Sequence, residues 1–319
     1  MLTQMNVMRT YLRLLILPVN QNVDYDYPRS KSLQEPKTFF SFLLLVAIFS
    51  YAMVVFKRQP LMGFGIFWFF LTLSVESLVT TTDVINEHRL YLPMVGYSIF
   101  LITTSFHALG IKDLRRMMIP LLLIITCYSV LTYRRNFIWK DELTLWGDAV
   151  RKSPEKARVY SSRGIAYHMA GDFDKALLDY TKAIALSPNR METAHTNRGT
   201  IYFFRGNIEE AISEYTKAMA INSHYKEAFY NRGLAYSKKG DFLKAISDYT
   251  QAITIDPSDA QYYYNRGNAF FHLGDLDQAI IDYDKAIEIR PNFRGAYHNR
   301  GIAFLKKSNM SQVRSMFGR

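Results

Sequence analysis

The second half of the chain repeats one phrase every 34 or 35 residues. Each copy has an Arg-Gly pair with an aromatic residue three positions after the glycine. A period of this length predicts a helix–turn–helix unit. Such a unit cannot bury its own apolar face, so neighbouring units must stack into a solenoid with a long binding surface. The pairs are Arg163-Gly164, Arg198-Gly199, Arg232-Gly233, Arg266-Gly267 and Arg300-Gly301.

Placing each of these glycines at position 8 of a unit aligns the other recurrent residues. Positions 20 and 27 are alanines in the first four units, as expected where helices approach closely. A Gly-Asp or Gly-Asn pair between the helices supplies a C-cap and then an N-cap. Position 24 is a tyrosine in each of the first four units: Tyr180, Tyr215, Tyr249 and Tyr283. This pattern is that of tetratricopeptide repeats, at 157–191, 192–225, 226–259, 260–293 and 294–319.

The fifth unit departs from the pattern. Val313 replaces the expected alanine, and Ser308-Asn309 replaces the Gly-Asp pair. We expect the chain to stop inside the second helix of this unit, without the polar capping helix that usually ends a solenoid. The unit is therefore predicted to be incomplete, as in a fragment of a longer gene product.

The first half is rich in apolar residues. Each of four stretches has the length needed for a helix to cross a bilayer. The alternative is the buried helical core of a soluble domain. We predict an all-α protein with an N-terminal extracytoplasmic segment at 1–37, four transmembrane helices within 38–133 and a connecting helix at 134–156. The four stretches are Thr38–Phe56, Pro60–Val79, Leu92–Gly110 and Met117–Tyr133.

Loop charges predict the orientation of this membrane part. Lys57-Arg58 and Lys112–Arg116 concentrate basic residues in two short loops, whereas Thr80–Tyr91 has Arg89 as its one basic residue. The positive-inside rule places the two basic loops in the cytoplasm. The 1–37 segment and the repeats then lie on the non-cytoplasmic side, although Arg134 and Arg135 oppose this assignment. The N-terminus has no pattern of a cleavable signal peptide.

Composition excludes several kinds of site. The chain has 39 Lys and Arg against 28 Asp and Glu, a net charge of +11. This excess occurs in both halves and favours contact with anionic membrane surfaces over nucleic-acid binding. Cys127 is the single cysteine, so an internal disulfide is impossible. Neither a nucleic-acid partner nor a metal site is predicted.

Two places in the membrane part have side chains suited to chemistry. Glu76 lies near the end of the second stretch, where a carboxylate faces either a protein interior or the interface. The second place is Glu87, His88, Arg89 and Tyr91, before the third stretch. Arg89 could clamp a lipid phosphate, and His88 or Glu87 could move a proton. The alternative for this cluster is an interfacial anchor.

In the repeats, position 6 of the first helix carries the candidate ligand-binding residues. An asparagine amide both donates to and accepts from a peptide backbone. The alternative is that these residues are repeat consensus. They are Asn197, Asn231, Asn265 and Asn299. The position-7 arginines favour either an acidic partner or pairing within the repeat, and Tyr230, Tyr262 and Tyr264 either stack on a ligand or pack in the core.

The order of several motifs resembles a known enzyme family. Tyr11–Pro18, Asp24–Pro28, Glu87–Pro93 and Trp139–Trp146 precede the repeats. This order is similar to the C-terminal part of the transmembrane-and-tetratricopeptide protein O-mannosyltransferases, which are membrane glycosyltransferases of the GT-C type. The resemblance implies a polyprenyl-phosphate-sugar donor, a protein hydroxyl as acceptor, repeats on the non-cytoplasmic side and main-chain contacts by the position-6 asparagines.

The chain departs from this family at the catalytic motif. In the family an acidic motif lies in the first extracytoplasmic loop, and nothing here corresponds to it. Asp24 and Asp26 match a later segment, so no catalytic residue is assigned and the chain alone is expected to be inactive. No cofactor is predicted, with a divalent metal left open for a full-length parent. We expect a membrane-anchored protein whose solenoid recruits a peptide or protein acceptor; the alternative is a non-catalytic membrane-tethered scaffold.

Overall fold

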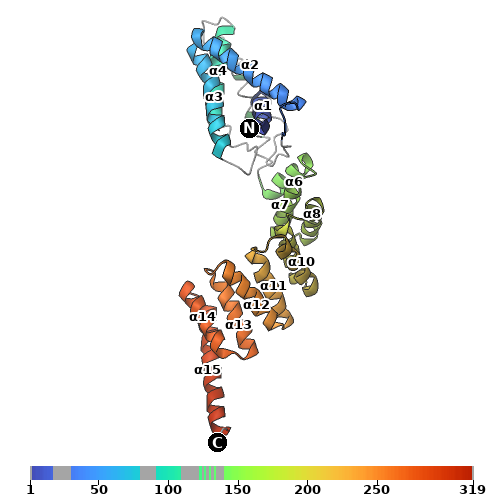
Figure 1. The fold of residues 1–319 in the computed structure, drawn as a ribbon, viewed down its shortest axis with the longest axis vertical. Coiled ribbons are helices and arrows are strands. Elements are labelled where there is room, and N and C mark those ends of the chain that lie inside the picture. The colour runs from blue at the N-terminus through green and yellow to red at the C-terminus, as the bar shows by residue number, and fades with distance from the viewer. Residues whose placement is uncertain are drawn as a thin grey trace. The chain divides into compact units, whose positions relative to one another are not determined.

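The computed structural model describes residues 2–16, 30–79, 91–108, 122–123, 126, 129–130, 133 and 140–317. The chain divides into two units, Met1–Val159 and Tyr160–Arg319, which we describe separately. Every regular element in the described residues is a helix (Figure 1). The predicted all-α class is confirmed for this part of the chain.

Three helices of the first unit, α2, α3 and α4, coincide with three of the four predicted apolar stretches. The fourth stretch lies largely outside the described residues. Within the described part, α2 is the one helix long and apolar enough to cross a membrane, and the apolar parts of α3 and α4 are shorter. The multi-span arrangement therefore stays a prediction. The helices are α1 (Leu2–Ile16), α2 (Pro36–Arg58), α3 (Pro60–Val79), α4 (Tyr91–Ala108) and α6 (Glu142–Lys152).

Helix α1 is tied to the start of α2 by the buried side chain of Asn6. Its Nδ2 donates to Ser30 Oγ at 2.8 Å and to Thr38 Oγ1 at 2.9 Å, and its Oδ1 accepts from Ser41 Oγ at 2.6 Å. Full hydrogen bonding makes the burial of this amide tolerable. The N-terminal segment thus begins with a helix docked on α2, and Tyr11 packs in the same apolar core.

Helices α3 and α4 approach backbone to backbone at two glycines. A Cβ atom on Gly65 would stand 2.6 Å from the carbonyl oxygen of Gly96, and one on Gly96 would stand 2.5 Å from that of Gly65. Small residues at a crossing allow the close packing that holds helices together in lipid.

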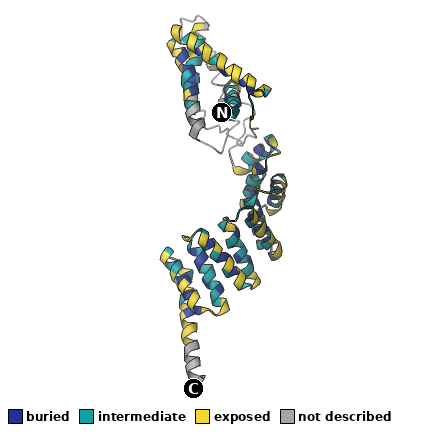
Figure 2. Ribbon diagram, viewed as in Figure 1, coloured by how far each residue is buried: buried dark blue, intermediate teal, exposed yellow. Residues whose placement is uncertain are grey.

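The outer face of α2 is apolar and uncovered. Phe40 is 65% exposed and Val54 is 62% exposed. Figure 2 shows exposed residues along most of this helix. Exposed apolar surface of this kind is expensive in water and is the surface that a bilayer would cover.

The second unit is a row of helix pairs. The first helix of each pair ends at a glycine with φ between 80° and 87°, a region that other residues enter at a steric cost. The residue after three of these glycines caps the second helix, as when Asp241 accepts from the Lys244 amide. The pairs are α7 (Ala157–Met169) with α8 (Phe173–Leu186), α9 (Glu192–Phe204) with α10 (Ile208–Ile221), α11 (Lys226–Lys239) with α12 (Phe242–Ile255), and α13 (Ala260–Leu273) with α14 (Leu276–Ile289).

Packing between helices follows the repeat positions. The position-24 tyrosine of each pair lies over the position-8 glycine of the same pair, as Tyr180 does over Gly164. The same tyrosine also belongs to an apolar cluster with the first helix of the next pair, where Tyr180 meets Ala194 and Ile201. Each tyrosine therefore wedges neighbouring units together.

The fifth unit differs from the sequence prediction. Instead of a turn and a second helix, α15 runs without interruption from Arg294 to Phe317. The physical reason lies at Ser308-Asn309, where no glycine supplies the left-handed C-cap that ends the other first helices. Gly301 consequently has no atom within 4 Å of a built Cβ, because no tyrosine covers it.

Candidate functional site

The first helices of the repeats form one continuous face. Helix α11 contacts both α9 and α13, and α13 contacts α15. Each second helix sits between two first helices, as α12 does between α11 and α13. First helices that touch one another lie on the inner side of the curved array, which is the concave side of a solenoid.

Two of the position-6 asparagines are bonded within this face. Asn265 Nδ2 donates to the hydroxyl of Tyr230 at 2.9 Å, and Asn299 Nδ2 donates to that of Tyr264 at 3.1 Å. In each case the tyrosine is the position-5 residue of the preceding repeat. Asn299 Nδ2 also donates to Asn268 Oδ1 at 2.8 Å. These amides link neighbouring repeats, which the sequence did not indicate.

Asn231 has a different environment. Its side chain is partly buried and makes no hydrogen bond with the residues that the structure describes. Asn197 lies beside the hydroxyl of Tyr180, whose pKa burial raises. The structure therefore divides the four predicted ligand residues, and Asn231 keeps both its donor and its acceptor available to a peptide backbone.

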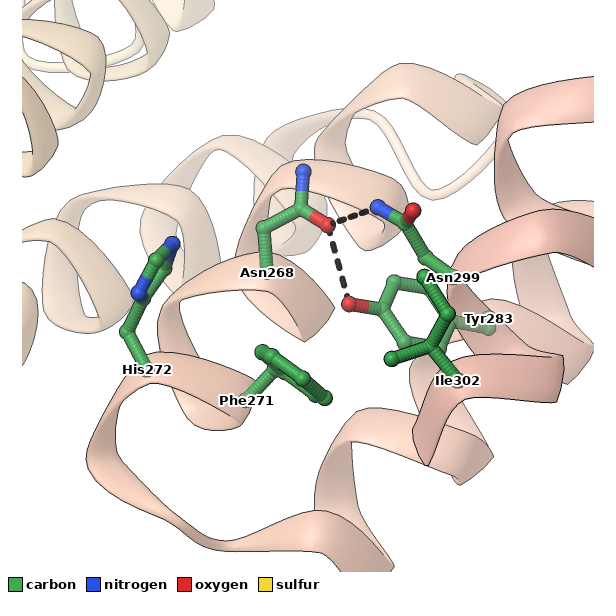
Figure 3. A pocket seen from close by; sticks show the side chains of 6 residues that line it. All are labelled: Asn268, Phe271, His272, Tyr283, Asn299 and Ile302. Carbon is green, nitrogen blue, oxygen red and sulfur yellow. Dashed lines mark hydrogen bonds between the residues drawn. The ribbon is translucent and has the colours of Figure 1, made fainter. Parts of the chain in front are cut away.

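A cavity of about 240 Å³ opens between the first helices of the fourth and fifth repeats. Asn268 lines it, and its Oδ1 accepts from Tyr283 Oη at 2.9 Å and from Asn299 Nδ2 (Figure 3). The cavity thus combines two amide groups with the apolar side chains of Phe271 and Ile302. Its lining residues are Asn268, Phe271, His272, Tyr283, Asn299 and Ile302.

The tyrosines proposed for ligand stacking pack against other rings. The centroids of Tyr230 and Tyr262 are 5.0 Å apart, and those of Tyr264 and Phe293 are 4.8 Å apart. Burial raises the pKa of Tyr230, while the Asn265 hydrogen bond opposes that rise. The hydroxyls of Tyr230 and Tyr264 accept from asparagines, and Tyr262 is buried, so the core-packing interpretation describes these residues.

The position-7 arginines of the first four repeats are paired within their own repeats. Arg232 donates through Nε and Nη2 to both oxygens of Asp248 at 2.8 Å, and Asp248 is 3% exposed. The same fork joins Arg163 to Asp179 and Arg266 to Asp282. Bidentate pairing satisfies these guanidinium groups. They do not offer free charge to an acidic partner.

From the second repeat onward, the position-7 arginines also reach the preceding repeat. Arg232 Nη1 donates to Thr216 Oγ1 at 3.0 Å, and Arg266 Nη1 donates to Thr250 Oγ1 at 3.1 Å. Arg198 makes the equivalent bond to Thr181. In the last unit Arg300 reaches Asp284, which occupies the threonine position. The arginine ladder is therefore a device for stacking repeats.

The second repeat has a variant of this pair. Glu214 replaces aspartate and accepts from Arg198, from Lys217 and from the ring of buried His195 at 2.8 Å. Burial raises the pKa of Glu214, but these hydrogen bonds outweigh it and place the pKa at about 2.

The donor-lipid candidates fall outside this description. Glu87, His88 and Arg89 lie outside the described residues. Tyr91 opens α4 and Glu76 lies in α3, but neither side chain is among those described. In the part that is described, no group of three or more His, Cys, Asp or Glu side chains is arranged to hold a metal ion.

Sequence reasoning missed four residues of the inner face: Asn268, His272, Lys238 and Lys306. They occupy position 9, which follows position 6 by three residues, and position 13, which follows position 9 by four. That spacing places them on the same side of the first helix as the position-6 asparagines. A face-by-face comparison of the repeats could therefore have identified them.

Comparison with protein families supports this architecture. The tetratricopeptide-repeat family matches residues 157–190, 227–259 and 260–293, and a second repeat family of the same kind matches residues 199–240. The second half of the chain is built of tetratricopeptide repeats. The position-8 glycines and position-24 tyrosines described above are the positions at which these repeats hold together.

Curated relatives come from the enzyme group that the motif order resembles. The chain is 27% identical over 108 residues to protein O-mannosyl-transferase TMTC3 of Homo sapiens, covering 33% of this chain and 12% of the relative. It is 27% identical over 185 residues to protein O-mannosyl-transferase F38B6.6 of Caenorhabditis elegans, covering 55% and 26%. The predicted resemblance is confirmed, and the chain spans about a quarter or less of these relatives.

Solved structures with similar repeats include MamA, at 26% identity and a TM-score of 0.44 over 47% of this chain and 86% of that one. The first tetratricopeptide domain of Spaghetti (RPAP3), bound to an HSP90 peptide, is 29% identical with a TM-score of 0.37, covering 38% and 95%.

Proposed function

We propose that this protein is a membrane-anchored acceptor-recruiting component related to polyprenyl-phosphate-sugar-dependent protein O-glycosyltransferases. Its tetratricopeptide repeats hold a protein or peptide acceptor along the inner face. The observation that carries the proposal is the amide row of that face, with the unbonded Asn231 and the neighbouring cavity at Asn268. The named relatives, which are O-mannosyl-transferases, supply the reaction context.

The inner face suits an extended peptide for a physical reason. A peptide main chain offers alternating donors and acceptors, and a carboxamide such as that of Asn231 satisfies one of each. Asn265 and Asn299 position the tyrosines of neighbouring repeats instead of meeting ligand directly. The ligand then meets a face whose side chains are already ordered, which lowers the entropic cost of binding.

The membrane anchor in this proposal consists of α2, α3, α4 and the 117–133 stretch. The uncovered apolar face of α2 and the glycine contact between α3 and α4 support it. With the basic loops in the cytoplasm, the repeats lie on the non-cytoplasmic side. An impermeant thiol reagent tests this in sealed vesicles of known orientation, using Gln59→Cys and Ser258→Cys separately in a Cys127→Ser background. Labelling of both positions from the same side would contradict the topology.

Peptide binding is tested with the detergent-solubilised full chain on an array of serine- and threonine-containing dodecapeptides. Asn231→Ala removes two main-chain hydrogen bonds of about 1 kcal/mol each, so affinity for the bound peptides should fall about thirtyfold. Asn292→Ala, an exposed asparagine in the turn before α15, is the matched control. Equal binding by both variants would show that position 6 does not hold the peptide.

Sugar transfer separates the proposal from the non-catalytic scaffold. Peptides that bind on the array are incubated with polyprenyl-phosphate mannose. One reaction contains the chain alone, and another contains the chain together with membranes that hold a complete transferase. We expect the chain to enhance transfer by those membranes and the Asn231→Ala variant to do so less. Peptide binding without any enhancement would favour the scaffold.

A further inference from the structure

The inner face has one basic edge, formed at position 13 of three consecutive first helices. Lys238, His272 and Lys306 recur there at intervals of 34 residues. All three side chains are exposed. Position 13 lies on the same helix face as positions 6 and 9, so this edge borders the amide row on which the proposed function rests.

The two lysines of the edge have no carboxylate partner among the described residues. Each is instead held over an aromatic ring of the preceding repeat. Lys238 Nζ lies 4.7 Å from the centroid of Phe203, and Lys306 Nζ lies 4.7 Å from that of Phe271. A ring face positions an ammonium group without neutralising it.

The neighbouring position-14 cations are treated differently. Lys239 bonds to Glu209 at 2.5 Å, and Arg205 bonds to Asp174 at 2.7 Å. Lys307 pairs with Asp277 in the same way. In every case the acid is the position-18 residue of the preceding repeat. The basic side chains at position 14 are therefore each paired with a carboxylate. The two lysines at position 13, which border the inner face, are not paired in this way within the described part of the chain.

The cavity adjoins this uncompensated edge. Phe271, which carries Lys306 above its ring, lines the cavity together with His272. His272 is fixed by stacking on Phe242, with centroids 4.7 Å apart and an angle of 5° between the rings. A carboxylate entering the cavity would meet the His272 ring and the Asn268 amide, which both line it (Figure 3), and Lys306 is held over the Phe271 ring of the same lining.

We propose that the inner face selects an extended peptide segment bearing Asp or Glu side chains. Lys238, His272 and Lys306 receive the carboxylates, and Asn231 holds the main chain. Charge-assisted hydrogen bonds make these contacts stronger than neutral ones. This inference rests on the proposed function, because it names the chemistry of the peptide that the same face takes.

The other end of the same helices carries charges of both signs. Glu227, at position 2, is exposed and Asp259 caps α13, but the exposed Arg294 lies at position 1 of the fifth repeat. The position-13 edge is therefore the more basic of the two edges and the one that attracts an acidic segment. An anionic membrane would need these lysines on an outer surface, whereas they border the concave side. Lysines in a last helical turn also complement the helix dipole, and the following experiment separates that role from ligand binding.

Fluorescence anisotropy with the full chain in neutral detergent provides the test. The probes are a labelled decapeptide of alternating Glu and Ser and its counterpart of alternating Gln and Ser. We expect about tenfold tighter binding of the Glu peptide, with the difference shrinking as salt rises. Lys238→Gln with Lys306→Gln should reduce this preference to about twofold or less. Lys182→Gln with Arg190→Gln removes the same charge from exposed positions outside the first helices and should leave the preference intact.

Each outcome decides between the two levels of the proposal. Equal binding of both peptides, or a preference that survives the Lys238 and Lys306 changes, overturns the acidic selection and leaves peptide recruitment standing. If the unaltered chain binds neither decapeptide and no peptide of the array, both the acidic selection and the peptide recruitment are overturned. Retention of the Glu preference in the double variant together with loss of sedimentation with phosphatidylserine vesicles would assign the lysines to a membrane surface. Circular dichroism of the variants confirms that they are folded.

Discussion

The ring of Tyr249 lies against the backbone of Gly233, where a Cβ atom would stand 2.7 Å from the tyrosine Cε1. Tyr249 is 1% exposed and has no space into which to move. The absence of a side chain at position 8 is therefore what allows the two helices of the third repeat to close. Gly301 lacks any such neighbour.

Gly233→Ala should destabilise the solenoid. Overpacking a buried contact costs about 1–3 kcal/mol, which exceeds the gain of roughly 1 kcal/mol from replacing glycine by alanine in a helix. Gly301→Ala should stabilise the chain through the gain in helix propensity, without the overpacking cost. Urea unfolding of the full chain in detergent measures both changes, and equal effects would show that the tyrosine contact is not tight.

Arg232→Met should be among the most damaging substitutions in the repeats. It leaves Asp248 buried without its partner, a loss of about 3–5 kcal/mol in comparable sites. Adding Asp248→Leu should recover most of the loss, because the uncompensated charge is removed as well. A double variant as unstable as Arg232→Met would mean that the bond from Arg232 to Thr216 carries the effect.

The Glu214 site should make stability depend on acid pH. Its pKa lies at about 2 in the folded chain against an ordinary 4.5, with the lowering due to His195, Lys217 and Arg198 in spite of burial. The unfolded chain therefore binds a proton more readily, and the stabilisation is present above pH 4.5 and lost as the pH falls from there toward 2. Glu214→Gln should flatten the stability profile in this range. An unchanged slope in thermal unfolding between pH 5 and pH 3 would contradict this.

Gly96→Ala should loosen the contact between α3 and α4. The added methyl group would meet the Gly65 carbonyl oxygen and the backbone nitrogen of Phe69, neither of which can move as a side chain does. We expect a cost of about 1–3 kcal/mol, seen as a lower melting temperature in detergent. Gly147→Ala, in α6, has open space around it and serves as the control.

The repeat half of the fold was predictable because its period is local. The positions of Gly171, Gly206, Gly240 and Gly274 marked each turn, and all four adopt positive φ. The end of α15 was predicted less well. Alignment by repeat position predicted a turn at Ser308-Asn309. That alignment does not take into account whether the residues at this place can end a helix.

The chemistry of the inner face was harder to predict. Position-6 asparagines look equivalent in the sequence, yet Asn265 is bonded to Tyr230 and Asn231 is not bonded in this way. The partner lies 35 residues away on another helix, so the distinction depends on how repeats stack. The pairing of Arg232 with Asp248, 16 residues along the chain, is hidden for the same reason. The membrane half carries no comparable period, and its Asn6 contacts could not be anticipated.

The arginine forks make the repeat array tolerant of changes in length. Thr181, Thr216 and Thr250 present the same acceptor to the next repeat, and each receives the same guanidinium nitrogen. Removal of residues 226–259 would bring Thr216 to Arg266, whose pairing with Asp282 lies within its own repeat and is unchanged. Duplication of the same block would add a threonine and an arginine together. Gain or loss of whole units during evolution could therefore lengthen or shorten the binding face without requiring a new interface.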